Sequence, residues 1–278
     1  VGPPGTGKTS CALKKMVETF HADKDSQILL LSYTNRAVDE ICKSLASIRP
    51  AVDFIRVGSE LSCDEAYRGH LIENELASCT RRADVYERIR NCRIMVGTVA
   101  AISGKPELFR LKHFDVAIVD EATQILEPQL LGILCAHGEG DRNAIDKFIL
   151  IGDHKQLPAV VLQKAEQSAI YDETLLAIGL TNLKDSLFER LLSELPCRSP
   201  FTRYALSSGT YASQSRLVCQ PGFLWRTSDT GRPAASDRVI RTHFPSCFLS
   251  FTAGEGGRVG QDKLFRSPYC RRSGSSNL

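Results

Sequence analysis

The chain has 278 residues, 42% of them hydrophobic and 24% charged, and a formal net charge of +3. This length suits one large domain or two small ones. No stretch is long and apolar enough to cross a membrane, and no signal peptide is recognisable. We therefore expect an intracellular protein, in the cytoplasm or in the nucleus or nucleoid, that has no membrane partner.

Ten cysteines are spread along the chain, and no two of them form a C-x-x-C pair. This spacing argues against a zinc site. Unpaired, buried thiols in a reducing compartment explain the cysteines better. The histidines at 113, 137 and 154 stand alone in the sequence, so we expect them on the surface or in loops.

The first ten residues contain a segment that fits the phosphate-binding pattern G-x-x-x-x-G-K-[ST]. Its glycines let backbone N–H groups point at phosphate oxygens, and the helix predicted from about 9 to 20 adds its positive end. Lys8 is expected to reach the β and γ phosphates of ATP as a catalytic residue, and the Thr9 hydroxyl to bind Mg²⁺. A glycine-rich turn with a chance lysine is the alternative. The residues expected to bind the nucleotide are Gly2, Pro3, Pro4, Gly5, Thr6, Gly7, Lys8, Thr9 and Ser10, together with Asp120, Glu121 and Gln156 further along the chain.

Small polar side chains follow two of the predicted strands. Thr34 and Asn35 come after the strand at 27–32, and Thr98 comes after the strand at 93–97. Loops at the carboxyl ends of strands bind ligands in α/β sheets, and hydroxyl and amide groups suit the phosphate backbone of a single-stranded nucleic acid. The alternative is helix capping by Thr34 or Asn35. The two roles are compatible.

The strand predicted over 115–119 ends in two acidic residues. Its apolar run is typical of a strand buried on both faces. Asp120 is expected to hold Mg²⁺ through water, and Glu121 to orient and deprotonate the water that attacks ATP. An apolar run ending in Asp-Glu often only caps the next helix, but the phosphate loop upstream favours the catalytic interpretation.

The loop after the strand predicted over 148–152 carries the run Gly152-Asp153-His154-Lys155-Gln156-Leu157-Pro158. A glutamine on such a loop can reach the terminal phosphate of ATP without a charge of its own. We therefore assign Gln156 to nucleotide binding and catalysis, as a sensor that relays the presence of this phosphate to neighbouring elements.

Predicted helices and strands alternate over residues 1–196. The strands are expected at 27–32, 53–57, 93–97, 115–119 and 148–152, and the helices at 9–20, 36–46, near 127–136 and at 185–194, with a polar helical stretch over 60–91. This alternation indicates an α/β domain with a parallel sheet and helices on both faces.

Five segments resemble motifs of superfamily 1 helicases, in particular the group that includes the nonsense-mediated-decay RNA helicase and senataxin. The run 152–158 resembles motif III and 120–124 resembles motif II, with Thr123 where many members have serine or alanine. The segments 32–39, 96–102 and 186–192 are similar to motif Ia, the next nucleic-acid motif and the helix after motif III. The resemblance covers residues 1 to about 195. It implies a RecA-like P-loop NTPase domain that uses ATP and Mg²⁺ to move 5′ to 3′ along single-stranded DNA or RNA.

Two functions stay open: a helicase, or a P-loop ATPase that works as a switch or scaffold without unwinding. The motif Ia resemblance and Gln156 favour the helicase. No residue that would read base edges or the ribose is identifiable, so the sequence does not distinguish DNA from RNA. Protein partners stay unknown from the sequence.

Residues 197–278 differ in composition, with 12 Lys and Arg residues against 4 acidic ones. We expect a basic tail rich in Ser, Gly and Arg, without regular structure. One interpretation is an arm that binds nucleic acid. The other, which we favour, is a reading-frame shift between about 193 and 206. Three segments can be back-translated with suitably chosen codons and read one base later: 207–213, 223–227 and 259–268. In the shifted frame they resemble, in the same order, parts of the second motor domain of the family.

Val1 stands directly before the phosphate loop, so we expect a fragment that lacks the first strand of its sheet. The resemblance also implies that ATP hydrolysis needs an arginine from a second motor domain. That arginine belongs to a motif that residues 210–212 replace here. We therefore expect little ATPase activity from the 278-residue chain alone.

Overall fold

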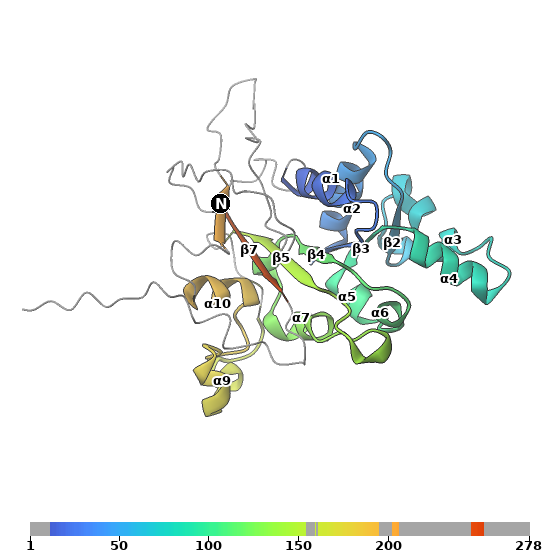
Figure 1. Cartoon of the computed structure of the whole chain (residues 1–278). Helices are drawn as coiled ribbons and strands as arrows, with labels where there is room; N and C mark the ends of the chain where they lie inside the picture. Colours follow the sequence, from blue (N-terminus) through green and yellow to red (C-terminus); the bar gives the residue numbers. More distant parts are fainter. Residues whose placement is uncertain (1–11, 154–158, 160, 195–201, 206–245, 253–278) are drawn as a thin grey trace, which may run out of the picture.

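The structure is a computed structural model that describes residues 12–153, 159, 161–194, 202–205 and 246–252 (Figure 1). Its sheet has the strand order β2-β3-β1-β4-β5-β7-β6. The first five strands in this order are parallel to one another. They are β1 (Ile28–Ser32), β2 (Phe54–Val57), β3 (Ile94–Thr98), β4 (Val116–Val119) and β5 (Lys147–Gly152). The α/β class and the parallel sheet predicted from the sequence are confirmed.

Helices cover both faces of the sheet, since its strands are apolar on both sides. Leu29 and Leu31 point to one face, and Ile28 and Leu30 to the other. In Figure 1, α1 (Lys14–His21) and α2 (Asn35–Ala46) lie above the sheet, and α5, α6, α7 and α10 lie below it. These four helices are α5 (Val99–Ser103), α6 (Glu107–Leu111), α7 (Glu127–Leu134) and α10 (Leu187–Glu194).

The polar stretch predicted as helical over 60–91 consists of short pieces. These are the 3₁₀ helices η2 (Glu60–Ser62) and η3 (Glu65–His70), followed by α3 (Ile72–Glu75) and α4 (Arg82–Asn91). Only Cys63, Leu71, Ile72 and Ile89 are buried apolar residues between 58 and 91. With so few apolar positions, no continuous stripe is available to hold one long helix against the sheet.

Two strands occur in the stretch where we expected no regular structure, which corrects that expectation for 202–205 and 246–252. Here β7 (Ser246–Thr252) pairs antiparallel with β5, and β6 (Thr202–Ala205) pairs antiparallel with β7. The edge of a strand offers unpaired N–H and C=O groups to any extended segment, and composition does not reveal such pairing. The domain boundary at 196 and the reading-frame shift stay predictions.

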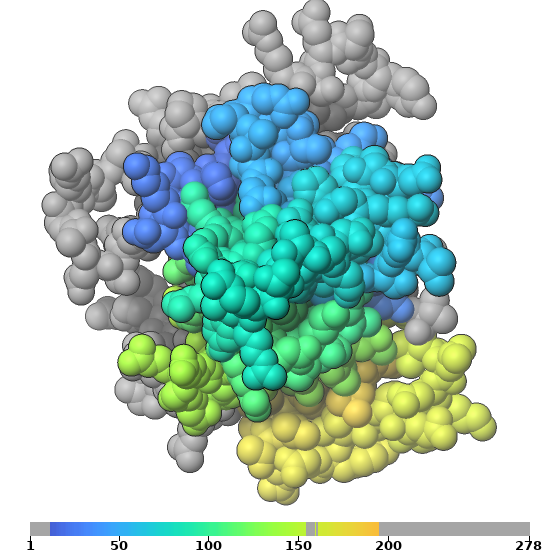
Figure 2. Space-filling model, turned by 90° about the vertical axis from the view of Figure 1, so that its right-hand side faces the viewer, coloured from blue at the N-terminus to red at the C-terminus, as the bar shows by residue number. Residues whose placement is uncertain are grey.

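Four further short elements occur among the described residues. They are the 3₁₀ helices η4 (Ala122–Gln124) and η5 (Glu139–Asp141), and the pair α8 (Ala165–Ser168) and α9 (Glu173–Ala177). Residues 161–186, yellow in Figure 2, stand out from the body of the molecule. None of the described helices is long and apolar enough to cross a membrane.

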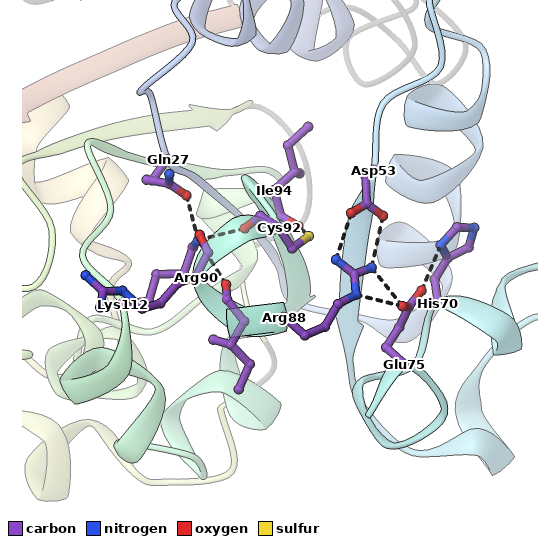
Figure 3. Close-up of polar contacts among 10 residues, drawn as sticks. Gln27, Asp53, His70, Glu75, Arg88, Arg90, Cys92, Ile94 and Lys112 are labelled. Carbon is purple, nitrogen blue, oxygen red and sulfur yellow. Dashed lines mark hydrogen bonds and ion pairs between the residues drawn. The ribbon is translucent and has the colours of Figure 1, made fainter. Parts of the chain in front are cut away.

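A buried lysine closes the end of α4 and attaches it to the sheet (Figure 3). Lys112 is 5% exposed, and its Nζ donates to Gln27 Oε1 at 2.5 Å and to the carbonyls of residues 89, 90 and 92 at 3.2, 3.1 and 2.6 Å. Burial lowers the pKa of Lys112 to about 8, so the amine is still charged at pH 7. The ammonium satisfies carbonyls that the end of a helix leaves without partners.

Lys112→Met should lower the free energy of unfolding by about 2–3 kcal/mol, because it leaves buried carbonyl groups without a donor. Urea unfolding followed by circular dichroism measures the change. Lys105→Met is the matched control, since Lys105 is partly exposed and pairs with Glu73 at 3.2 Å. It should change stability by less than about 1 kcal/mol. Equal losses in the two variants would contradict the role assigned to Lys112.

Candidate nucleotide and nucleic-acid site

Asp120 lies at the carboxyl end of β4, beside the end of β1. Its backbone N–H donates to the Leu31 carbonyl at 2.8 Å, and its own carbonyl accepts from Ser32 Oγ at 3.3 Å. The residue is only 3% exposed. Its Oδ1 accepts from the backbone N–H of Glu121 at 3.0 Å, which fixes the carboxylate at the edge of the sheet.

Glu121 has a backbone conformation that non-glycine residues rarely adopt. Its φ is 53° and its ψ 37°, in the left-handed region. This conformation costs an L-residue about 1–2 kcal/mol, and strain of this kind is typical of functional sites. The left-handed residue turns the chain sharply from β4 into η4, so that Asp120 and Glu121 both stay at the edge of the sheet. The sequence did not indicate this strain.

Asp153 adds a third carboxylate at the same edge. It follows β5, the neighbour of β4, and is 1% exposed. Mg²⁺ prefers oxygen ligands, so the carboxylates that follow β4 and β5 are of a suitable chemical type. Asp120 stays the predicted ligand.

Gly152 brings the end of β5 close to η4 and α10. A Cβ at this position would lie 3.0 Å from Thr123 Cγ2 and 3.2 Å from the Phe188 ring. The motif II-like and motif III-like segments therefore pack directly on each other and on the helix that follows. Thr123, the departure from the helicase pattern, is 3% exposed and fills this contact.

An ion pair reinforces the same contact. Arg190 of α10 binds Glu127 of α7, with Nε donating to Oε2 at 2.7 Å. Arg190 also donates to the Ile178 carbonyl at 2.8 Å. This ion pair thus holds the start of α7, which follows the acidic pair in the chain, against α10. Sequence reasoning missed this pair, because its two members are 63 residues apart.

The candidates for strand binding lie on the other side of β1. Ser32 and Thr98 are register partners at the ends of β1 and β3. Thr34 caps α2 by accepting from the Ala37 N–H at 3.2 Å, so the capping alternative holds for this residue. Thr98 caps α5 in the same way, with 3.1 Å to the Ala101 N–H, and is 7% exposed. Thr34 is exposed and Asn35 half-buried, so these two are more accessible to a ligand than Thr98.

Tyr33 is a candidate that sequence reasoning did not select. It is 42% exposed, directly after β1 and directly before the cap Thr34. An exposed aromatic ring beside small polar groups suits the stacking of a base. The signal in the sequence is an aromatic residue between a buried strand and a helix cap.

The phosphate loop and the sensor glutamine are not among the described residues. Gly2, Pro3, Pro4, Gly5, Thr6, Gly7, Lys8, Thr9, Ser10 and Gln156 all fall outside the described ranges. Their roles stay predictions. The described part of the first helix begins as α1 at Lys14 and packs on the sheet through Met16 and Val17.

The five cysteines whose side chains are described are free, as expected. Burial raises the pKa of Cys42 to about 12 and of Cys92 to about 11, so these thiols are protonated at neutral pH. Cys135 is exposed, which differs from the expected burial.

At the opposite, amino edge of the sheet, His113, Asp115 and Asp146 bring ligand atoms within 4.8 Å of one another. His113 already pairs with Asp146 at 3.0 Å, and Asp115 accepts from the Gln27 N–H at 2.6 Å. His137 contacts Asp141, and His154 is outside the described residues. As expected, His113 and His137 are surface residues, and we assign no ion to them.

The AAA domain family matches this chain over residues 1–82 and 70–164. The chain belongs to this family, within the superfamily 1 helicases. It is 34% identical over 193 residues to the human "DNA replication ATP-dependent helicase/nuclease DNA2". The matched region covers 69% of this chain and 16% of that protein. It is 24% identical over 245 residues to the "DNA polymerase alpha-associated DNA helicase A" of Saccharomyces cerevisiae, over 71% of this chain and 34% of that protein.

The chain thus spans about a sixth of the human relative. The narrower resemblance to the nonsense-mediated-decay helicase and senataxin group stays a prediction. Among solved structures, the Hef helicase domain of Pyrococcus furiosus is similar at 13% identity and a TM-score of 0.26, over 40% of this chain and 18% of that one. The fold assignment rests on the strand order and not on that likeness.

Glu121→Gly should be more stable than Glu121→Ala by about 1 kcal/mol. Both variants lose the carboxylate, but only glycine adopts the left-handed conformation without strain. Thermal and urea unfolding of the two variants measure the difference. Equal stability, or a more stable alanine variant, would show that the backbone at Glu121 is not strained.

Proposed function

We propose that this chain is the first motor domain of a helicase that hydrolyses ATP and moves 5′ to 3′ along a single strand. The observation that carries the proposal is the order of groups along one edge of the sheet. The strand-binding candidates follow β3 and β1, and the acidic residues follow β4 and β5. Hydrogen bonds between Ser32, Leu31 and Asp120 join the two sets.

Each residue has a distinct part in this proposal. Lys8 holds the β and γ phosphates, Thr9 and Asp120 hold Mg²⁺, and Gln156 senses the γ phosphate. Mg²⁺, when bound, neutralises charge on the phosphates. Glu121 accepts the proton of the attacking water. The arginine that stabilises the transferring phosphate would come from a second motor domain.

The strand is bound through its backbone and one base. Thr34 and Asn35 offer polar groups to the phosphates. Thr98 lies at the end of the neighbouring strand β3, and Tyr33 stacks on a base. Such contacts carry little sequence preference and weaken with salt. The names of the relatives favour DNA over RNA.

Steady-state ATPase assays on the full-length protein test the proposal. Single-stranded oligo(dT) should stimulate hydrolysis, and the stimulation should fall as salt rises. Glu121→Gln should bind ATP normally but turn over about 100-fold or more slowly, because general-base catalysis contributes 10²–10⁴-fold. Lys8→Ala should lose ATP binding, and Lys15→Ala, a neighbouring surface lysine, should not.

ATPase activity that no single strand stimulates would support the alternative, a P-loop ATPase acting as a switch or scaffold. Normal turnover by Glu121→Gln would mean that another residue activates the water. Duplexes with either a 5′ or a 3′ single-stranded end test the direction, and unwinding only from a 3′ end would contradict the proposed polarity.

A further inference from the structure

An arginine is buried in the middle of β2, at the edge of the sheet. Arg56 is 1% exposed and stands between Ile55 and Val57, which are equally buried. Burying a guanidinium group is costly even when it is paired, and apolar residues of similar size often fold as stably. Packing alone does not explain an arginine at this position.

The partners of Arg56 come from two different parts of the chain. Its Nη1 pairs with Oδ1 of Asp39 in α2. Its Nη2 donates to the Ser62 carbonyl at 3.2 Å. The Asp39 carboxylate also accepts from the Asp64 N–H at 3.3 Å. One ion pair therefore joins β2, α2 and the start of the segment 58–93, which we call the inserted segment.

α2 is the helix that carries the candidate strand-binding loop. Thr34 is its N-cap and Asn35 its first residue, and Tyr33 comes directly before them. Asp39 lies about one helical turn after Asn35. An ion pair at Asp39 therefore fixes the start of α2, and with it the loop, relative to β2.

The inserted segment has a second attachment, which does not involve α2 (Figure 3). Arg88 binds the Asp53 carboxylate at 2.8 and 3.1 Å and Glu75 Oε2 at 2.7 and 3.1 Å, and Lys112 closes the end of α4. In Figure 2 the inserted segment, light blue to turquoise, forms much of the face toward the viewer. The segment is thus held at both ends, and only its first end reaches the strand-binding helix.

We propose that Arg56 and Asp39 are positioning residues for single-strand binding. The pair holds the loop of Tyr33 and Thr34 in place and couples it to the inserted segment, so that a displacement of this segment shifts the loop. The inference rests on the proposed strand-binding function. It adds two residues that touch neither the strand nor ATP.

The test compares the full-length protein with the double variant Arg56→Met/Asp39→Leu. Replacing both members of a buried ion pair by apolar residues is often close to neutral for stability, so the fold should be kept. The Kd for fluorescent oligo(dT) should rise about tenfold, the size of coupling seen between residues in contact. The oligo(dT) concentration for half-maximal ATPase stimulation should rise equally, with the rate at saturating oligo(dT) retained.

Arg88→Met/Asp53→Leu is the matched control, because it removes an ion pair of the same inserted segment that does not contact α2. It should bind oligo(dT) like the parent protein. If the first double variant fails to fold, Arg56→Gln/Asp39→Asn takes its place, since it removes both charges together and keeps polar side chains of similar shape. Asp39→Glu, which keeps the carboxylate, should restore most of the affinity.

Tyr33→Ala separates this inference from the function on which it rests. Loss of oligo(dT) affinity in Tyr33→Ala, with parental affinity in Arg56→Met/Asp39→Leu, would overturn the positioning role alone. Parental affinity in Tyr33→Ala would remove the strand-binding role of the loop, and the inference with it. Equal losses in the Arg56 and Arg88 double variants would show a general effect of the inserted segment and would also overturn the inference.

Discussion

The pairing of β1 with β4 is the constraint on which the site depends. Parallel pairing places the ends of these strands at one edge, where the Asp120 N–H reaches the Leu31 carbonyl and Ser32 Oγ reaches the Asp120 carbonyl. Two hydrogen bonds therefore connect Asp120 of the acidic pair with the end of β1, which leads directly into the loop of Thr34. Any movement at one of them strains the backbone of the other, because packed interiors transmit displacement.

Both faces of this sheet are apolar, and most of the buried charged groups among the described residues lie at its edges. Asp120 and Asp153 occupy the carboxyl edge, and Lys112 occupies the amino edge. Arg56, buried within β2, and Glu127, buried in α7 and paired with Arg190, are the exceptions. Each of these groups has polar partners that offset the cost of its burial.

The α/β class and the acidic pair could be predicted because they rest on short-range signals. An apolar run ending in Asp120 and Glu121 predicts a buried strand followed by a site, and the structure has the buried strand at this place. The predicted strands agree with the observed ones to within one residue at each end, since continuous apolar runs have clear limits. Their parallel order follows from the helices between them.

What the sequence could not show depends on long-range contacts or on backbone strain. The left-handed backbone of Glu121 and the ion pair of Arg56 with Asp39 leave no periodic trace. The pairing of β7 with β5 joins segments about 100 residues apart, by backbone groups that every sequence possesses. The short helices α5 and α6 span five residues each, too few for a helical period to be recognised.

The affinity of the full-length protein for a single strand, measured with and without a non-hydrolysable ATP analogue, tests the central claim most directly. If the nucleotide and strand sites share the edge formed by β1 and β4, the analogue must change the oligo(dT) Kd, and oligo(dT) must change the analogue's Kd by the same factor. Ser32→Ala, which removes one of the two hydrogen bonds, should reduce that factor. Identical strand affinities with and without the analogue would contradict the account.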